Sequence, residues 1–406
     1  MRIPKSALAL MTGTALAMFT SCSSTNNSST TLGTGFMWVA TAGDQTISSL
    51  TIDLSNGSVS SVRSTQPSGP NPSLMALTPD GSALFVSNID DNCGTAQTPA
   101  FCDSVRPFAI NTDGTIGSQG SVVHITSLTS NVPLGMKLGF AIDPSGKFLF
   151  VSDQGNSGPI GAAGTVEGTI SVFSISGTTL TPVGSPIVTT QFGDTIGTGP
   201  VALAVPAAGG FLYVANEFTS TVSAYSYDNS GNLTFTTNYP VAASPTALAF
   251  SRTVANTNRD NFLLVSNTGS NQVTSFLACV AVSLNCGTAN GVLSQLGGPF
   301  SAPIGPADII VNPAFDWVYV IEKSNQISQF RFVPATGALS PLSPGVISSG
   351  AGPVSGGVTS DGNWVFIANG TASNLSALAV SAAGKLSPAG TSSVLLASQP
   401  SAVVVR

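Results

Sequence analysis

A short pattern of apolar residues that ends in a polar residue recurs along the whole chain. Its copies start 47, 65, 63, 51, 55 and 47 residues apart. They occupy residues 36–41, 83–88, 148–153, 211–216, 262–267, 317–322 and 364–369. Short β segments that recur with a period of about 40 to 50 residues are typical of a β-propeller, with one copy in each blade. The sequence therefore predicts an all-β fold, a seven-bladed β-propeller with one copy in each blade. The blades are numbered here in the order of the copies along the chain.

The residues around each copy predict the other strands of a blade. Before the copy at 211–216, residues 199–205 have the character of a short inner strand, and a turn rich in Pro and Gly follows. The same turn is Pro79-Asp80-Gly81 in blade 2, where Pro presets φ and Gly accepts a positive φ. After the copy, residues 220–225 alternate as a half-buried third strand requires, and a fourth strand starts near Leu233.

The two ends of the propeller complement each other. The first copy has no inner strand before it, and residues 399–405 read as an inner strand with no hairpin after it. We expect these two parts to complete one blade, because closing the ring removes the exposed sheet edges. The sequence thus predicts one propeller domain over residues 35–406, closed by the C-terminal strand.

The first 34 residues predict export. Arg2 and Lys5 precede a short apolar stretch that is too short to span a membrane, as in a secretory signal. This signal peptide, residues 1–22, ends in Phe19-Thr20-Ser21-Cys22, which resembles a bacterial lipobox whose Cys is lipidated after cleavage. The alternative is simple cleavage of the signal. Residues 23–34 form a Ser/Thr/Asn-rich tether, so we expect a protein of the bacterial cell envelope, lipid-anchored at Cys22, or a secreted one.

The other four cysteines form two local pairs, Cys93 with Cys102 and Cys279 with Cys286. An exported protein meets an oxidising compartment, so these pairs predict two disulfides that staple loops. The alternative is a zinc site.

Charge excludes one class of partner. Only 7% of the residues are charged, and the chain has 12 Lys plus Arg with a formal net charge of −6. Because these few basic residues are spread over seven blades, they cannot form a continuous surface that binds a phosphate backbone. We therefore expect no nucleic-acid partner. We expect a monomer whose membrane contact is made only through its N-terminal anchor.

A family resemblance rests on the repeat. Tyr213-Val214-Ala215-Asn216 resembles the YVTN-type propeller repeat, and residues 35–406 resemble the seven-bladed lactonase family named for a 6-phosphogluconolactonase. The resemblance implies the propeller fold and hydrolysis of a sugar lactone. A phosphate site needs clustered Arg or Lys, which this chain lacks, so a phosphorylated substrate is not expected.

One face of the propeller is expected to carry the site. The loops from the second to the third strand and from the fourth strand to the next blade share a face, and on it residues 89–103, 118–136, 154–167 and 180–198 are long. All four lie on or between blades 2, 3 and 4, where a rigid scaffold would carry function. Neutral growth of surface loops is the alternative.

Polar residues close each second strand and are expected to point into this face. They are Thr41, Asn88, Asp153, Asn216, Asn267, Glu322 and Asn369. Asn and Asp here most simply cap the following turn. Glu322 fits that role poorly, and Glu217 follows the polar position of blade 4.

The third residues of the inner strands line the channel. They are Leu74, Gly139, Ala202, Ala247, Asp308, Ser355 and Ala402, of which Asp308 is the only charge. Asp308 could act as a general base, bind a divalent cation such as calcium, or accept hydrogen bonds from backbone amides. Lys137 occupies the Pro200 register in blade 3 and could meet an anion.

These residues give two hypotheses. In the first, the propeller binds a small ligand or protein through its loop-rich face, near Lys137, Asp153 and Glu217. In the second, it is a lactonase-like hydrolase that uses Asp308 and Glu322, either without a cofactor or with a divalent cation such as calcium. The single histidine, His124, is expected to be a solvated strand residue, so no Ser-His-Asp set can form.

Overall fold

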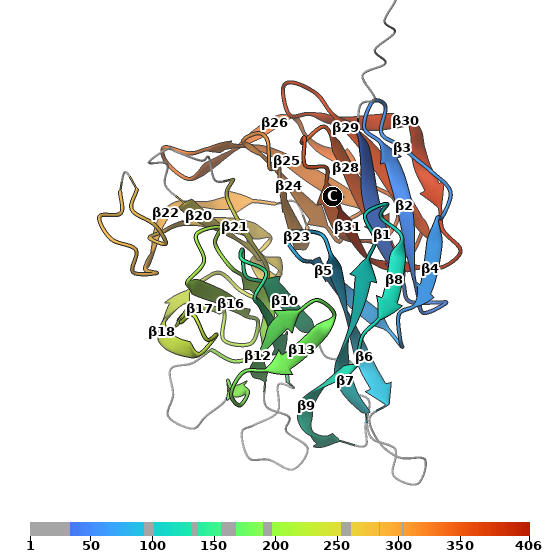
Figure 1. Ribbon diagram of the computed structural model, residues 1–406. Helices are drawn as coiled ribbons and strands as arrows, with labels where there is room; N and C mark the ends of the chain where they lie inside the picture. Colours follow the sequence, from blue (N-terminus) through green and yellow to red (C-terminus); the bar gives the residue numbers. More distant parts are fainter. Residues whose placement is uncertain are drawn as a thin grey trace, which may run out of the picture. The chain divides into compact units, whose positions relative to one another are not determined.

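The computed structural model describes residues 33–92, 101–130, 137–155, 168–189, 197–252, 261–283, 285–302 and 304–406. Gly33–Arg406 form one compact unit. In the described ranges the strands make seven antiparallel sheets, and the one helical turn is η1 (Thr268–Ser270). The sheets stand as blades around a ring, with β5, β10, β23 and β31 toward its middle (Figure 1). The predicted seven-bladed propeller is confirmed. The predicted signal peptide and Cys22 lie outside the described residues, as does the tether apart from Gly33 and Thr34.

Each blade has an inner strand, two middle strands and an outer edge, in the order predicted from the repeat. The inner strands of blades 1 to 7 are β31 (Pro400–Val405), β5 (Pro72–Leu77), β10 (Leu138–Ile142), β15 (Pro200–Ala204), β19 (Pro245–Phe250), β23 (Pro306–Val311) and β27 (Pro353–Val358). The second strands, which contain the repeated pattern, are β1 (Thr34–Thr41), β6 (Ala83–Asn92), β11 (Phe148–Asp153), β16 (Phe211–Asn216), β20 (Asn261–Asn267), β24 (Trp317–Glu322) and β28 (Trp364–Asn369).

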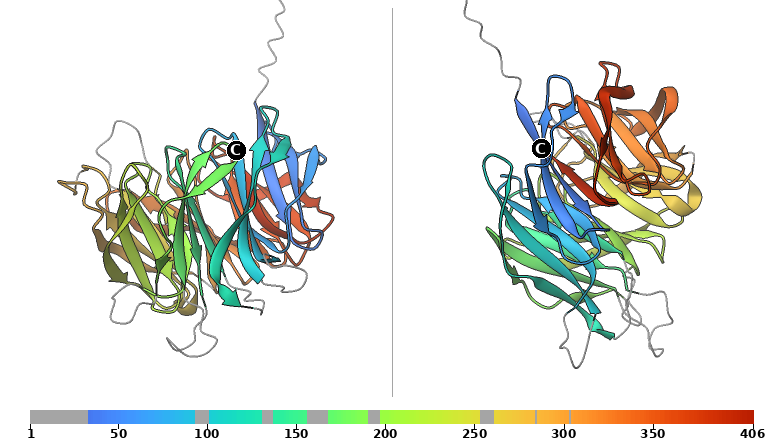
Figure 2. Two further views of the ribbon diagram at one scale, coloured as in Figure 1. Left: turned by 60° about the horizontal axis from the view of Figure 1, so that its bottom comes forward. Right: turned by 90° about the vertical axis from the view of Figure 1, so that its right-hand side faces the viewer.

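The outer half of each blade is more variable. The third strands are β2 (Thr46–Asp53), β7 (Phe101–Ile110), β12 (Thr169–Ser176), β17 (Thr221–Tyr227), β21 (Gln272–Ala278), β25 (Gln326–Val333) and β29 (Asn374–Val380). The outer edges are β3 (Ser58–Val59) with β4 (Ser64–Pro67), β8 (Ile116–Gln119) with β9 (Val123–Ser130), β13 (Thr179–Pro182) with β14 (Ile187–Val188), β18 (Leu233–Pro240), β22 (Leu293–Ser301), β26 (Ala338–Ser348) and β30 (Leu386–Leu395). Figure 2 shows the strands running from one face of the ring to the other.

The C-terminal strand closes the ring as predicted. β31 pairs antiparallel with β1, so that Val403 faces Val39 and Val404 faces Trp38. Phe36 and Arg406 exchange two backbone hydrogen bonds of 3.0 and 2.9 Å. The last strand therefore completes the sheet that the first strand begins, and blade 1 has no open inner edge.

Aromatic side chains lock neighbouring blades together. The first residue of the repeated pattern lies on a glycine in the outer hairpin of the next blade, so closely that a Cβ on that glycine would overlap the ring. These pairs are Phe36 on Gly114, Phe148 on Gly231, Phe211 on Gly291, Phe262 on Gly337, Trp317 on Gly384 and Trp364 on Gly57. Each of these glycines has a positive φ, a conformation that L side chains rarely adopt.

The junction between blades 2 and 3 lacks this lock. The repeated pattern of blade 2 begins with Ala83 instead of an aromatic residue, and nothing lies within 4 Å of a Cβ built on Gly177, the hairpin glycine of blade 3. Two cavities, of about 170 and 150 Å³, lie along this junction and are lined by residues of both blades. The junction of blades 2 and 3 is therefore held by its apolar cluster, which includes Phe85 and Phe173, without the aromatic lock of the other six junctions.

The predicted disulfide between Cys279 and Cys286 is present in blade 5. Cys286 is buried in the apolar cluster that joins blades 5 and 6, together with Phe262 and Phe332. Cys102 is also disulfide-bonded, and its expected partner, Cys93, lies outside the described residues.

Candidate functional site

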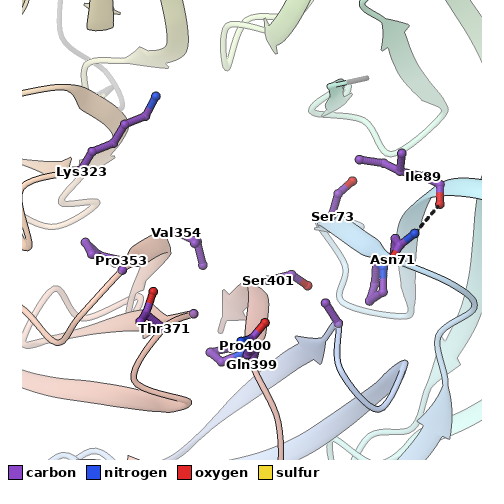
Figure 3. A pocket seen from close by; sticks show the side chains of 14 residues that line it. Asn71, Ser73, Ile89, Lys323, Pro353, Val354, Thr371, Gln399, Pro400 and Ser401 are labelled. Atoms are coloured by element: carbon purple, nitrogen blue, oxygen red, sulfur yellow. Dashed lines mark hydrogen bonds between the residues drawn. The ribbon is translucent and has the colours of Figure 1, made fainter. Parts of the chain in front are cut away.

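Two cavities meet at the mouth of the central channel, on the face that carries the loops from the second to the third strand. The wider one has a volume of about 680 Å³ and lies over blades 1, 2, 6 and 7. The narrower one, of about 260 Å³, lies over blades 2 to 6. Both are lined by Ser73, Ile89 and Lys323. In Figure 3, Lys323 lies on one side of the wider cavity, and Ser73, Asn71 and Ile89 lie on the other.

A β-bulge directs one residue of most inner strands toward the mouth. In six blades the inner strand begins with a Pro that pairs with the neighbouring strand, and the next residue to pair is two positions later. The residue between them is therefore unpaired and forms the bulge. Such an extra residue is re-aimed by the local twist. All six line one of the two cavities: Ser73, Val201, Thr246, Ala307, Val354 and Ser401.

Blade 3 has no bulge, and this moves Lys137. Leu138 pairs with Asp153, as Pro200 pairs with Asn216, and the ladder continues without a shift. Lys137 instead accepts a backbone hydrogen bond from Gln154, as Gly199 does from Glu217. The prediction that Lys137 occupies the Pro200 register was wrong by one residue, because the inner strand of blade 3 lacks the extra residue.

Lys137 lines the narrower cavity and is paired there with Glu217. Its Nζ donates to both carboxylate oxygens of Glu217, at 2.8 and 2.6 Å. The Nε2 of Gln154 donates to the same carboxylate at 2.6 Å. The structure thus brings together two of the three predicted ligand-binding residues, but they neutralise each other across the junction of blades 3 and 4.

Lys323 is a site residue that the sequence analysis missed. It follows Glu322 in the same way that Glu217 follows Asn216, and its side chain is exposed at the point where the two cavities meet. Among the described residues, no carboxylate forms an ion pair with Lys323. Its place in the sequence, directly after the polar residue that closes the second strand, is the signal that could have identified Lys323. Glu322 is buried, and Lys323 is the first residue after it to be exposed on the face.

The polar residues that close the second strands are buried, with relative exposures of 0 to 4%. The expectation that they point into the face was therefore wrong. The Nδ2 of Asn216 donates to Ser223 Oγ at 2.8 Å, and Asn369 makes the corresponding contact with Ser376 at 2.9 Å. Asp153 is also fully buried, and its Oδ1 accepts from the backbone N–H of Gly155 at 3.2 Å. These side chains hold the ends of the strands within their own blades.

Glu322 also makes its hydrogen bonds within its own blade. It is fully buried, and its carboxylate accepts hydrogen bonds from Ser328 and Ser324. Burial raises the pKa of this carboxyl, against the effect of those hydroxyls and of the Ile304 amide. Glu322 lines neither cavity at the mouth.

Asp308 lies one residue beyond Ala307, which lines the narrower cavity. Its Oδ1 accepts from the backbone N–H of Ile309 at 2.8 Å, and the Gly356 amide of blade 7 also donates to the carboxylate. Desolvation inside the ring raises the pKa of Asp308 in spite of these two amides. The residue is only half-buried, although it lines neither of the two cavities at the mouth.

The remaining expectations concern loops, metal and histidine. In the four long loops expected over blades 2 to 4, residues 93–100, 131–136, 156–167 and 190–196 lie outside the described residues. The expectation that 118–136 is one loop was wrong, because β9 (Val123–Ser130) lies within it and pairs with β7. The described ranges hold no cluster of three or more His, Cys, Asp or Glu suited to a metal ion. His124 lies beside the disulfide-bonded Cys102, with Nδ1 3.3 Å from its Sγ. The one helical turn within these ranges, η1, is too short to cross a membrane.

Comparison with known proteins agrees with this architecture. The model of a family described as lactonase, 7-bladed β-propeller, matches residues 102–351, which is more than half of the chain. None of the curated proteins compared with the sequence matches it.

Several solved structures share the fold at low sequence identity. The periplasmic gluconolactonase of Pseudomonas aeruginosa is 20% identical, with a TM-score of 0.70 over 92% of this chain and 99% of that one. A candidate 6-phosphogluconolactonase of Bacteroides uniformis is 17% identical, with a TM-score of 0.70 and the same coverage. A protein from Lactobacillus plantarum is 15% identical, with a TM-score of 0.67 over 92% of this chain and 100% of that one. At these identities the structures show a common fold, and the family match carries the assignment: this chain belongs to the lactonase family of seven-bladed β-propellers.

Proposed function

We propose that this protein is an exported hydrolase that binds a small lactone at the channel mouth and opens its ring. The observation that carries this proposal is the ammonium group of Lys323, which has no ion-pair partner among the described residues and stands where the two cavities meet. Such a cation at the mouth of a lactonase-family propeller is suited to a carbonyl or carboxylate oxygen.

Opening a lactone requires that water attack the carbonyl carbon and that negative charge develop on the carbonyl oxygen. In our proposal the Lys323 ammonium stabilises that oxygen, which is where preorganised charge accelerates acyl transfer most. Asp308 is the proposed general base for the attacking water. Its raised pKa makes its carboxylate a stronger base than an ordinary one.

A non-phosphorylated substrate fits this site better than a phosphorylated one. The basic residues that line the two cavities are Lys137 and Lys323, as far as the described residues show. Lys137 is already bound to Glu217. One available ammonium matches one negative or partly negative oxygen, whereas phosphate recognition normally uses several donors, often from Arg.

The proposed location is the cell envelope or the exterior. The N-terminal signal and Cys22 support export with a lipid anchor, and the Cys279–Cys286 disulfide suits an oxidising compartment. One of the solved structures with this fold is a periplasmic gluconolactonase. We propose a monomer that meets the membrane only through its anchor and has no nucleic-acid partner.

A second function, binding without turnover, is favoured by a separate observation. The carboxylates of Asp308 and Glu322 are both engaged in hydrogen bonds within the protein. If these bonds hold Asp308 away from water, the propeller would bind a lactone or its acid, or a protein, without hydrolysing anything.

Proton release in a weakly buffered solution tests the proposal. We expect the purified protein to open at least one of δ-valerolactone, δ-hexalactone and glucono-1,5-lactone faster than water does. Lys323→Met should lower kcat/KM by about 100-fold, whereas Lys385→Met, an exposed lysine in the hairpin between β29 and β30, should not change it. Saturable binding of these lactones without acceleration would establish the second function instead.

A further inference from the structure

The walls of the narrower cavity are mainly apolar. Leu74, Leu138, Val201 and Ala307 from four inner strands and Ile89 from blade 2 account for five of its nine lining residues. A ligand that leaves water for such a site gains from contact with hydrocarbon, while every hydroxyl group it brings must find a new partner.

The hydroxyl groups of the cavity already have partners. Ser73 Oγ lies 2.8 Å from Ser87 Oγ. Thr246 Oγ1 lies 2.7 Å from Thr268 Oγ1 and donates to the carbonyl oxygen of Pro306 at 3.1 Å. These are the two hydroxyl side chains among the lining residues. A ligand rich in hydroxyl groups would therefore find few hydroxyl partners in the narrower cavity, and both of these already take part in hydrogen bonds within the protein.

The charge of the cavity matches one anion. Of its two lysines, Lys137 is held by the Glu217 carboxylate through two short contacts, and Lys323 forms no ion pair with a described residue. The cavity thus combines an apolar wall with one available cation at its rim.

We propose that this site selects a small monocarboxylate with an apolar body, and the lactone that yields it, over the polyhydroxylated acid and lactone of a sugar. Lys323 binds the carboxylate, or the carbonyl oxygen of the lactone, and the apolar wall contacts the carbon skeleton. The inference rests on the proposed function for the place of the site, but it concerns which ligand is preferred, so it is tested separately from turnover.

Binding of acids tests the preference without any need for catalysis. Hexanoate and gluconate are both six-carbon monocarboxylates, and hydroxyl groups are the difference between them. By calorimetry or ligand-observed NMR we expect hexanoate to bind at least about tenfold more tightly than gluconate, because unpaired hydroxyls are costly to bury. Hexanamide, which lacks the charge, should bind more weakly than hexanoate. Equal or tighter binding of gluconate would overturn the proposal.

Matched variants locate the effect. Lys323→Met should reduce hexanoate affinity about tenfold or more and hexanamide affinity by a smaller factor, because the amide offers only a neutral carbonyl oxygen. Lys385→Met should change neither. Val201→Thr, nearly the same size, should weaken hexanoate and leave gluconate unchanged or bound more tightly. If hexanoate affinity is the same in Lys323→Met as in the unaltered protein, the assigned cation is wrong.

Turnover separates this inference from the proposed function. δ-Hexalactone and glucono-1,5-lactone share one carbon skeleton and differ in their hydroxyl groups. A higher kcat/KM for δ-hexalactone supports the inference, and a higher value for glucono-1,5-lactone overturns it while the proposed hydrolysis stands. If neither lactone is opened but hexanoate still binds in preference to gluconate, the proposed hydrolysis fails and the ligand preference survives.

Discussion

Trp364 of blade 7 lies on Gly57 of blade 1, and its indole N–H donates to the Leu54 carbonyl oxygen at 2.9 Å. This contact joins the last complete blade to the blade that contains both ends of the propeller. The same arrangement, an aromatic ring on a positive-φ glycine, recurs at five other junctions. The repeated pattern therefore serves two purposes, because its first residue packs against the next blade while the rest forms a strand.

The aromatic lock predicts unequal effects of two similar substitutions. Gly337→Ala and Gly177→Ala both place a methyl group at a positive φ, +67° and +57°. Only at Gly337 would the new methyl overlap an aromatic ring, that of Phe262. We expect Gly337→Ala to cost about 1 to 3 kcal/mol more in the free energy of unfolding than Gly177→Ala, as overpacking does. Urea denaturation of both variants measures this difference, and equal losses would contradict the lock.

Removal of residues 400–406 should destabilise the protein severely. These residues include all of β31, whose pairing with β1 provides the inner strand of blade 1. Without them the edge of β1 and the inner edges of the neighbouring blades become exposed. We expect a loss of soluble protein or a large fall in Tm, and removal of Arg406 alone serves as the milder control. An unchanged Tm after removal of the strand would refute closure by the C-terminal strand.

Glu217→Gln should strengthen anion binding. The substitution removes the carboxylate that holds Lys137 and leaves a second ammonium available beside the narrower cavity. We expect hexanoate affinity to rise a few-fold and to become more sensitive to salt. Asp228→Asn, which removes one negative charge from an exposed hairpin at the opposite ends of the strands, is the control and should have little effect. Weaker binding in Glu217→Gln would mean that Glu217 itself contacts the ligand.

Asp308→Asn should separate activity from stability. Because the folded-state pKa of Asp308 is raised by desolvation, its contribution to stability is complete below the unfolded pKa and is lost as pH rises through the folded value. The Tm of Asp308→Asn relative to the unaltered protein should therefore increase as the pH rises from below the unfolded pKa of this carboxyl through its raised folded pKa.

The proposed base acts in its ionised form, so turnover should rise with pH through the same folded pKa. Asp308→Asn should lower kcat by about 100- to 10,000-fold and abolish this dependence. A variant that keeps full activity would remove Asp308 from the mechanism and leave the stability prediction intact.

The fold was predictable because the same pattern of apolar residues that ends in a polar residue occurs seven times in the sequence. Each copy needs apolar residues that face both neighbours, and each turn needs Pro or Gly, so chance agreement is improbable. The closure by residues 400–405 followed from the same alignment, since blade 1 lacked an inner strand and the C-terminus offered one.

The site was less predictable because it depends on single-residue offsets. Asn216 and Glu322 look like face residues in the sequence, but their hydrogen bonds to the third strand turn them inward. The predicted register of Lys137 was wrong by one residue because it assumed a bulge in blade 3. The inner strand of blade 3 lacks both the bulge and the starting Pro of the other six. Lys323 was overlooked since an isolated lysine on a polar turn looks like an ordinary solvated residue, and only the cavities reveal its position.

The unlocked junction between blades 2 and 3 has a consequence for how the molecule would come apart. The first and last strands of the propeller meet in blade 1, yet both junctions of that blade have an aromatic lock, Trp364 on Gly57 and Phe36 on Gly114. A pulling force or a protease should instead first gain entry between blades 2 and 3. The ring would then unroll from an interior point of the chain while its two ends remain joined, so early cleavage is expected in the segment that links these two blades.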